Sequence, residues 1–166
     1  MMKRLQRLDL RCSELFLQHG YNQLQARISR LVSRTGDGPL YLLIALLLAA
    51  VDGSRGMAFL ISGLTIFAIE LPLYLLLKNF IRRERPRGLP VFIRPSDRYS
   101  LPSGHTAAAF VMASLVAAYY PYASGAAFVW ATCIGASRLL LGVHFLTDLV
   151  AGAVLGFGCA ALVLFC

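Results

Sequence analysis

Acidic residues are scarce in this sequence: Asp and Glu number 8 against 16 Lys and Arg, and these four types make up only 14% of the 166 residues. This shortage of charge, with 58% hydrophobic residues and a mean hydropathy of +0.67, argues against a soluble globular protein. Cysteine is also rare. The four cysteines are far apart, at Cys12, Cys133, Cys159 and Cys166. They suggest neither a CxxC metal site nor a disulfide framework, and we interpret them as packing residues.

Long apolar segments begin late in the chain. No apolar run of any length precedes Leu40, so we expect no cleavable signal peptide. Five segments then contain few charges: residues 39–51, 56–77, 104–120, 122–141 and 144–165. A helix needs about 20 residues to cross a hydrocarbon core, so the first segment must tilt, sit in a thinned bilayer or extend through its flanks. The sequence predicts an all-α integral membrane helical bundle with about five membrane helices.

Residues 1–35 carry two apolar stripes at helical spacing, each beside a stripe of arginines. The first combines Leu5, Leu8, Cys12, Leu15 and Phe16 with Arg4, Arg7 and Arg11, and the second combines Leu24, Ile28 and Leu31 with Arg27, Arg30 and Arg34. Both patterns predict basic amphipathic helices on anionic headgroups. We do not favour nucleic-acid binding, because these helices are tethered to a membrane domain and lack interleaved aromatic residues. We therefore divide the chain into a membrane-surface leader, residues 1–35, and a membrane-embedded domain, residues 36–166.

The connections between the apolar segments indicate where polar residues meet. Residues 78–101 form a long polar connection that is rich in arginine, and loops of this length usually serve a function. Counting crossings places the end of the second segment, the start of the third, the end of the fourth and the start of the fifth on one face. We expect the chemistry of the protein on that face.

The first polar group on this face contains Lys78 and, after six intervening residues, Arg85 followed by Pro86. If the segment is helical and stopped by Pro86, both cations can converge on one anion. Arginine offers a planar fork that matches phosphate oxygens, and lysine offers a compact charge. A basic cluster that only anchors the helix is the alternative.

The second group, from Pro102 to His105, stands at the start of the third apolar segment. A proline followed by small residues exposes backbone N–H groups at the positive end of the helix dipole, which favours a phosphate. Ser103 adds a hydroxyl donor, and His105 is placed to protonate a departing oxygen. Alternatively, Ser103 only caps the helix and His105 lies in the membrane interface.

The third group contains Ser137, Arg138, His144 and Asp148. On a helix His144 and Asp148 share a face, so the carboxylate can hold one imidazole nitrogen and leave the other as a nucleophile. Arg138 supplies a further cation for a transition state that gathers negative charge. An acid inside a membrane helix is costly, which indicates a functional site, although a His–Asp pair that merely joins helices is the alternative.

Together the three groups resemble the three signature motifs of the type 2 phosphatidic acid phosphatase superfamily. That superfamily is similar in fold to bacterial acid phosphatases and vanadium haloperoxidases. Every signature position is present in order between Lys78 and Asp148, which makes the match far more specific than any single motif. The resemblance implies an acid phosphatase/vanadium haloperoxidase-like core. It also implies that the phosphate is bound by Lys78, Arg85, Ser103, Gly104 and Arg138.

For catalysis, the resemblance implies that His144 attacks phosphorus to form a phosphohistidine and that Asp148 orients His144. His105 would protonate the leaving alkoxide and later activate water. No metal and no cofactor are implied. The sequence agrees, since it has no Asp/Glu cluster suited to magnesium and no His/Cys set suited to zinc.

We therefore expect a membrane phosphatase that hydrolyses a lipid phosphate or polyprenyl diphosphate, whose lipid chains stay in the bilayer. A lipid phosphotransferase and a non-enzymatic protein that binds anionic lipids are the alternatives. Lys and Arg are concentrated in residues 1–35 and 78–98, and Arg55 alone stands on the other side. The positive-inside rule then predicts a bacterial cytoplasmic membrane with the active site on the cytoplasmic face, even when the cations required by the chemistry are discounted.

Overall fold

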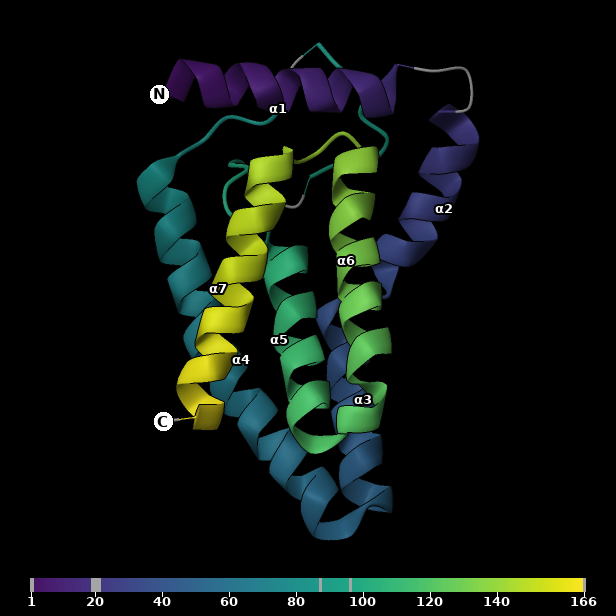
Figure 1. Cartoon of the computed structure of the whole chain (residues 1–166), viewed down its shortest axis with the longest axis vertical. Coiled ribbons are helices and arrows are strands. Elements are labelled where there is room, and N and C mark those ends of the chain that lie inside the picture. The colour runs from purple at the N-terminus through teal and green to yellow at the C-terminus, as the bar shows by residue number, and fades with distance from the viewer. Residues whose placement is uncertain (1, 19–21, 87, 96, 166) are drawn as a thin grey trace.

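The computed structural model describes residues 2–18, 22–86, 88–95 and 97–165, and within these residues all regular structure is helical. In chain order the elements are α1 (Met2–Leu17), α2 (Asn22–Arg34), α3 (Gly38–Val51), α4 (Gly53–Ile81), α5 (Gly104–Tyr119), the short 3₁₀ helix η1 (Pro121–Ala123), α6 (Ser124–Leu140) and α7 (Leu146–Phe165). Helices α3 to α7 run roughly along the long axis of the molecule (Figure 1). The predicted all-α membrane bundle is confirmed.

Fewer helices reach membrane-spanning length than the sequence indicated. Within the described residues, Gly53–Ile81, Pro121–Leu140 and Leu146–Phe165 are long and apolar enough to cross a bilayer. The pair Asn22–Arg34 and Gly38–Val51 passes the same test only as one span bent by 44°. Helix α5 has 16 residues and falls short of the length required. The described part of the chain thus offers three spans, or four with the bent pair, where we expected about five.

Helix α4 carries the first polar group to the end of the bundle. It continues past the predicted boundary at residue 77, so that Lys78 lies in its last turn. The helix ends at Arg82, which adopts the left-handed conformation with φ 52° and ψ 38° and donates its N–H to the Lys78 carbonyl at 3.1 Å. A left-handed residue of this kind is a common helix C-terminus. It fixes the point at which the arginine-rich loop begins.

Helix α5 lies at the centre of the bundle, against α4, α6 and α7. The contact with α7 is close because α7 carries glycines: a Cβ on Gly156 would lie 2.1 Å from the Ala107 carbonyl oxygen, and one on Gly152 2.5 Å from the Ser103 carbonyl oxygen. Small residues at such positions let membrane helices approach each other. The Ser103 N–H accordingly donates to the Asp148 carbonyl at 3.0 Å. The starts of α5 and α7 are therefore joined directly.

The two leader helices pack differently from each other. Helix α1 lies across one end of the bundle, whereas α2 descends beside α6 (Figure 1). The buried residues are Asp9, Ser13 and Leu17 in α1 and Ala26, Ser29 and Ser33 in α2. The predicted apolar stripes face outward instead, with Leu8, Leu15, Phe16, Leu24, Ile28 and Leu31 exposed. The side chains of Arg4, Leu5 and Arg7 lie outside the described residues, and the position of the leader on lipid headgroups stays a prediction.

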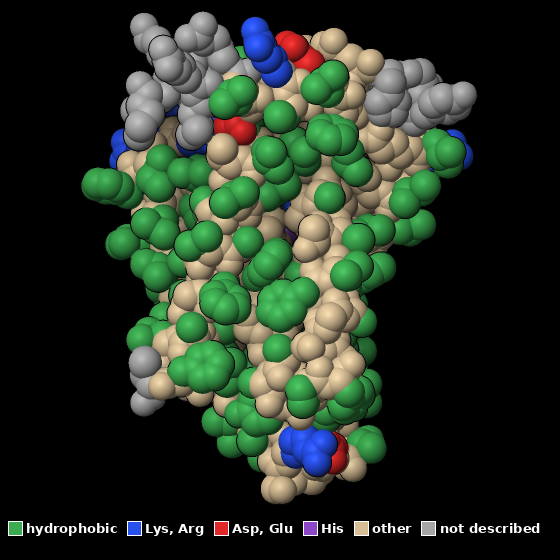
Figure 2. Space-filling view, in the orientation of Figure 1, with side chains coloured by type: hydrophobic (Ala, Val, Ile, Leu, Met, Phe, Trp, Pro, Cys, Tyr) green, Lys and Arg blue, Asp and Glu red, His purple; other side chains and the backbone are tan. Residues whose placement is uncertain are grey.

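On the face that Figure 2 shows, exposed apolar side chains cover the middle of the molecule, and charged side chains lie toward its two ends. The long loop after α4 returns across the α1 end. The Ser100 N–H donates to the Arg83 carbonyl at 2.9 Å, and the Phe92 N–H donates to the Leu141 carbonyl at 3.1 Å. The apolar part of the loop, Phe92 and Ile93, packs on Leu141 and Val143. These contacts bring the loop against the turn between α6 and α7.

Candidate active site

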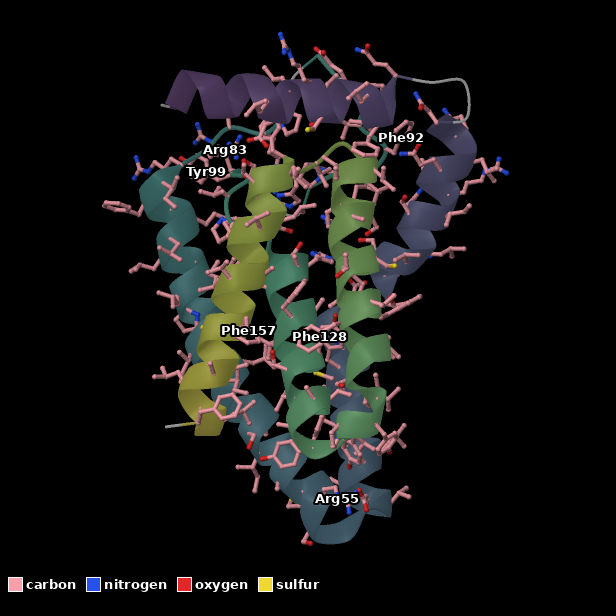
Figure 3. The ribbon with its side chains drawn as sticks, viewed as in Figure 1. Arg55, Arg83, Phe92, Tyr99, Phe128 and Phe157 are labelled. Carbon is pink, nitrogen blue, oxygen red and sulfur yellow. The ribbon has the colours of Figure 1, made fainter. Side chains whose placement is uncertain are left out.

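The three predicted polar groups meet at the end of the bundle that α1 covers. The C-terminal ends of α4 and α6 and the N-terminal ends of α5 and α7 all lie toward this end (Figure 1). Figure 3 shows Arg83 here, with Arg55 at the far end. The expected common face therefore exists. Each group is held by contacts that link distant parts of the chain.

The first group converges on a carboxylate that the sequence analysis did not single out. Lys78 is buried at 3% exposure, and its Nζ donates to Asp97 Oδ1 at 2.9 Å. Arg85 Nη2 donates to the same oxygen at 2.6 Å, and the Tyr74 hydroxyl donates to Asp97 Oδ2 at 2.7 Å. Partial burial would raise the pKa of Asp97, but the hydrogen bonds from Lys78 and Tyr74 and the charge of Lys78 outweigh it and lower that pKa to about 2.

His144 lies in the turn between α6 and α7 rather than on the helix itself. The turn requires Gly142, whose φ is 74° and whose missing side chain leaves room for the Pro90 carbonyl oxygen. The His144 ring still faces the predicted partner, with Nδ1 3.6 Å from Asp148 Oδ2. Its other nitrogen, Nε2, lies 3.5 Å from Arg85 Nη1. His144 of the third group therefore lies next to Arg85 of the first group.

Burial determines the charge of this histidine. His144 is 3% exposed, and its desolvation lowers the pKa to about 4, although the neighbouring Asp148 carboxylate opposes the shift. The ring is therefore neutral near pH 7. A neutral imidazole held beside a carboxylate on one side and a guanidinium on the other can act as a nucleophile toward a group bound to that guanidinium.

Asp148 is completely buried, and each of its oxygens has a partner. Oδ2 accepts the Phe145 N–H at 2.8 Å, and Oδ1 accepts from Arg83 Nη1 at 2.7 Å. Asp148 is the third residue of α7, and its bond back to the residue before the helix resembles the return bond of a capping box. This local arrangement explains why an acid is tolerated at the start of an apolar helix.

The second group places Ser103 and Gly104 at the start of α5. Ser103 is fully buried and makes no side-chain cap, and its hydroxyl accepts from Thr106 Oγ1 at 2.9 Å. A Cβ on Gly104 would lie 2.9 Å from the Tyr74 ring. Glycine at position 104 therefore leaves room for Tyr74, whose hydroxyl donates to Asp97. His105 Nε2 lies 3.0 Å from Asp37 Oδ1, just before α3. Among the described residues, His105 forms no hydrogen bond with the other predicted site residues.

Arg138 is held by the leader. Its side chain is buried at 4% exposure, and Nη1 donates to the Ser33 hydroxyl of α2 at 2.7 Å. The Arg138 Nε is buried and has no hydrogen-bond partner among the described residues. A buried donor without a partner is costly and calls for an explanation. An anion bound at this end of the bundle would provide one.

Five residues of this site were not predicted: Asp9, Asp37, Tyr74, Arg83 and Asp97. A sequence signal existed for Tyr74, which stands one helical turn before Lys78 and receives a hydrogen bond from its Nζ at 2.7 Å. Asp37, Arg83 and Asp97 lie in loops, where periodicity gives no guidance. Asp9 lies on α1, whose predicted stripes of apolar residues and arginines gave no indication of a buried acid. Within the part of the chain that is described, no group of three or more His, Cys, Asp or Glu side chains could hold a metal ion.

Comparison with known proteins identifies relatives. A family model described as PAP2 superfamily matches residues 56–166. Phosphatidylglycerophosphatase B of Bacillus subtilis (strain 168) is 36% identical over 104 residues, which cover 56% of this chain and 50% of that protein. Decaprenylphosphoryl-5-phosphoribose phosphatase of Mycobacterium tuberculosis is 31% identical over 129 residues, covering 74% of this chain and 69% of that protein. The match to the Bacillus protein thus spans only half of its length.

Two solved structures are similar over almost the whole chain. The transmembrane PAP2 type phosphatidylglycerolphosphate phosphatase from Bacillus subtilis superposes with a TM-score of 0.76 at 25% identity, covering 96% of this chain and 84% of that one. LpxE of Aquifex aeolicus gives a TM-score of 0.81 at 24% identity, covering 95% and 94%. With its apolar helices, this likeness makes the chain an integral membrane protein. Coverage this high includes most of the leader.

Proposed function

This chain belongs to the PAP2 superfamily, and from that premise we propose that it hydrolyses a lipid phosphate or polyprenyl diphosphate through a phosphohistidine intermediate. One observation carries the proposal: Lys78 Nζ and Arg85 Nη2 converge on a single carboxylate oxygen of Asp97, at 2.9 and 2.6 Å. Carboxylates and phosphates are bound by the same charge-assisted hydrogen bonds, so donors that hold one can hold the other. Arg85 Nη1 also lies 3.5 Å from His144 Nε2, which supports an anion site beside the proposed nucleophile.

The first step transfers the phosphoryl group to the enzyme. His144 Nε2 attacks phosphorus, a P–N bond forms, and the P–O bond to the lipid breaks. Lys78, Arg85 and Arg138 stabilise the charge that develops on the phosphoryl oxygens. The Arg138 Nε, which has no hydrogen-bond partner in the part of the chain that the structure describes, is an available donor. His105 gives a proton to the departing alkoxide, and Asp37, 3.0 Å away, orients its ring.

The second step releases phosphate. Water attacks phosphorus, the P–N bond breaks, and His105 accepts the proton of the water. Asp148 stabilises the His144 ring while it carries the phosphoryl group, since its Oδ2 lies 3.6 Å from Nδ1. The products are a lipid alcohol, or a lipid monophosphate from a diphosphate, and inorganic phosphate.

An apolar cavity near the site suits the lipid part of such a substrate. It has a volume of about 220 Å³ and lies between α3, α4 and α5, with Tyr41, Ala45, Phe59 and Gly63 among its lining residues. The lining begins at Gly38, the residue after the Asp37 that contacts His105. The cavity can therefore hold the first part of an acyl or prenyl chain while the headgroup reaches the cations.

The test is phosphate release from phosphatidic acid, phosphatidylglycerol phosphate and undecaprenyl diphosphate in detergent with EDTA, comparing the wild type with His144→Ala and with Glu14→Gln. Glu14 is exposed on α1 and serves as the control. We expect turnover by the wild type and the control, and a loss of at least about 10³-fold in His144→Ala. A strict requirement for magnesium, or full turnover by His144→Ala, would contradict the mechanism.

The same assay separates the two alternatives. A phosphotransferase would pass the phosphoryl group to the hydroxyl of another lipid, so a phosphorylated lipid would accumulate in place of free phosphate. A protein that only binds anionic lipids would show no turnover for His144→Ala to lose. We also propose that the site faces the cytoplasm of a bacterial cell. Among the residues that the structure describes, Lys and Arg concentrate toward the α1 end and Arg55 alone lies at the other.

A further inference from the structure

A buried acid on the leader helix contacts the candidate active site. Asp9 is only 2% exposed, although it lies on a helix that crosses the end of the bundle. A buried carboxylate destabilises a protein unless it is paired and hydrogen-bonded. Asp9 has such partners in two other parts of the chain: its Oδ2 accepts from Arg83 Nη2 and from the Thr147 hydroxyl, and its Oδ1 accepts the Thr147 N–H at 3.2 Å.

Arg83 continues this connection to Asp148. Its Nη1 donates to Asp148 Oδ1 at 2.7 Å and to the Thr147 hydroxyl, while Nη2 binds Asp9. Its guanidinium also lies over the Phe145 ring, with Cζ 4.3 Å from the ring centroid. Arginine alone offers a planar set of donors that can bridge two carboxylates in this way. The Arg83 side chain is thus fixed from α1 on one side and from the start of α7 on the other.

We propose that α1 is part of the catalytic apparatus: Asp9 fixes Arg83, and Arg83 fixes the Asp148 carboxylate that orients His144. Arg83 and Asp9 are therefore positioning residues. Without Arg83, Asp148 Oδ1 loses its hydrogen bond and the carboxylate can rotate about its remaining contact with the Phe145 N–H. The inference rests on the proposed function, in which His144 must be aligned with phosphorus.

The first experiment measures kcat and KM for phosphate release from phosphatidic acid by the full-length protein. A misplaced catalytic group lowers kcat, so we expect Arg83→Ala to reduce it about 10- to 100-fold with KM within about twofold. Arg83→Lys should recover part of the loss, since lysine keeps the charge and one contact. Asp9→Asn should reduce kcat about 3- to 10-fold and add little in the Arg83→Ala background, because Asp9 acts mainly through Arg83.

Two variants serve as matched controls. Arg82→Asn changes the neighbouring arginine, whose Nε donates to the Asn79 carbonyl at 2.8 Å, and asparagine tolerates the left-handed backbone found there. Glu14→Gln changes an exposed acid of α1. Both should keep wild-type kcat. Equal kcat in Arg83→Ala and Arg82→Asn, or a loss confined to KM, would overturn the inference. If Arg83→Ala does not fold, Asp9→Asn decides, and an unchanged kcat in that variant also overturns it.

A second readout does not depend on turnover. The ring ¹⁵N resonances of His144 should shift in Arg83→Ala and Asp9→Asn but not in Arg82→Asn, because only the first two change how Asp148 meets the ring. Unshifted resonances in Arg83→Ala would overturn the inference. Failure of the proposed function looks different: the wild type would release no phosphate, or His144→Ala would retain its turnover, whatever the positioning variants do.

Discussion

Asp97 is the residue whose change tests the anion site most directly. Its carboxylate holds Lys78 and Arg85, two of the three cations that the proposed mechanism assigns to phosphate. A phosphate that binds both must first displace Asp97. The Asp97→Asn variant keeps the size of the side chain but removes its charge. We therefore expect it to bind oxyanions more tightly than the wild type.

The size of this effect follows from the contacts that are lost. Hydrogen bonds to charged groups contribute about 1.5 to 3 kcal/mol each, but pairs exposed to solvent contribute about 0 to 1 kcal/mol. The Asp97 side chain is 30% exposed, so its contacts fall between these limits. An asparagine also keeps weaker versions of them. Removing the charge should therefore favour a competing anion by about 1 to 2 kcal/mol, which is about 5- to 30-fold in affinity.

The assay is the inhibition constant of orthovanadate, an oxyanion of the same shape as phosphate, for wild type and Asp97→Asn. We expect the inhibition constant of Asp97→Asn to fall about 5- to 30-fold. Asp52→Asn is the control, because Asp52 binds the Tyr120 hydroxyl at 2.9 Å in the turn at the far end of the bundle. A higher inhibition constant in Asp97→Asn would refute the reasoning, since it would mean that Asp97 holds the two cations in place for the substrate instead of competing with it.

Three other predictions concern the nucleophile, the lipid cavity and the topology. Burial lowers the pKa of His144 to about 4, against the opposing effect of Asp148. The ring should therefore become protonated, and kcat should fall, only as the pH drops through about 4. A midpoint near 6.5 in a ¹⁵N titration of the ring would contradict this prediction. Filling the cavity with Ala45→Phe should raise KM for a long-chain lipid phosphate about 10-fold and leave KM for a water-soluble phosphate monoester unchanged. Equal increases in KM for both substrates would exclude the cavity as the site of the lipid chain. In a cysteine-free background, an impermeant thiol reagent on intact cells should label Ser54→Cys at the far end and not Glu14→Cys on α1, and the reverse pattern would place the site outside.

Hydropathy predicted the positions of the membrane helices well because lipid requires each of them to be a long, predominantly apolar segment. The expected segments begin and end within a few residues of α3, α5, α6 and α7. The packing of α2 was not predicted, because the apolar face of a helix in a bilayer can face lipid instead of the protein core. Its apolar stripe faces outward, and Ala26, Ser29 and Ser33 face the bundle, as small residues do between membrane helices.

The predicted site residues came from short motifs, whereas the missed ones other than Tyr74 are joined over longer separations. Asp9 and Arg83 are 74 residues apart in sequence, and Asp97 lies in a loop without periodicity. No spacing rule connects an acid on a leader helix with an arginine in a later loop. The His144–Asp148 pair shows the opposite case: the two residues face each other as helical spacing predicts, although a turn and not a helix carries His144.

The distribution of charge at the site separates the arginines by role. Arg83 is committed to Asp9 and Asp148, two buried carboxylates that no substrate needs to displace. Lys78 and Arg85 share the single, partly exposed carboxylate of Asp97, and among the described residues Arg138 pairs with no carboxylate. In the proposed mechanism, displacement of Asp97 leaves three cations for one phosphoryl group. That number matches a phosphate that carries about two negative charges and spreads them over its oxygens in the transition state. The acids of the site thus determine which cations are available for the proposed reaction.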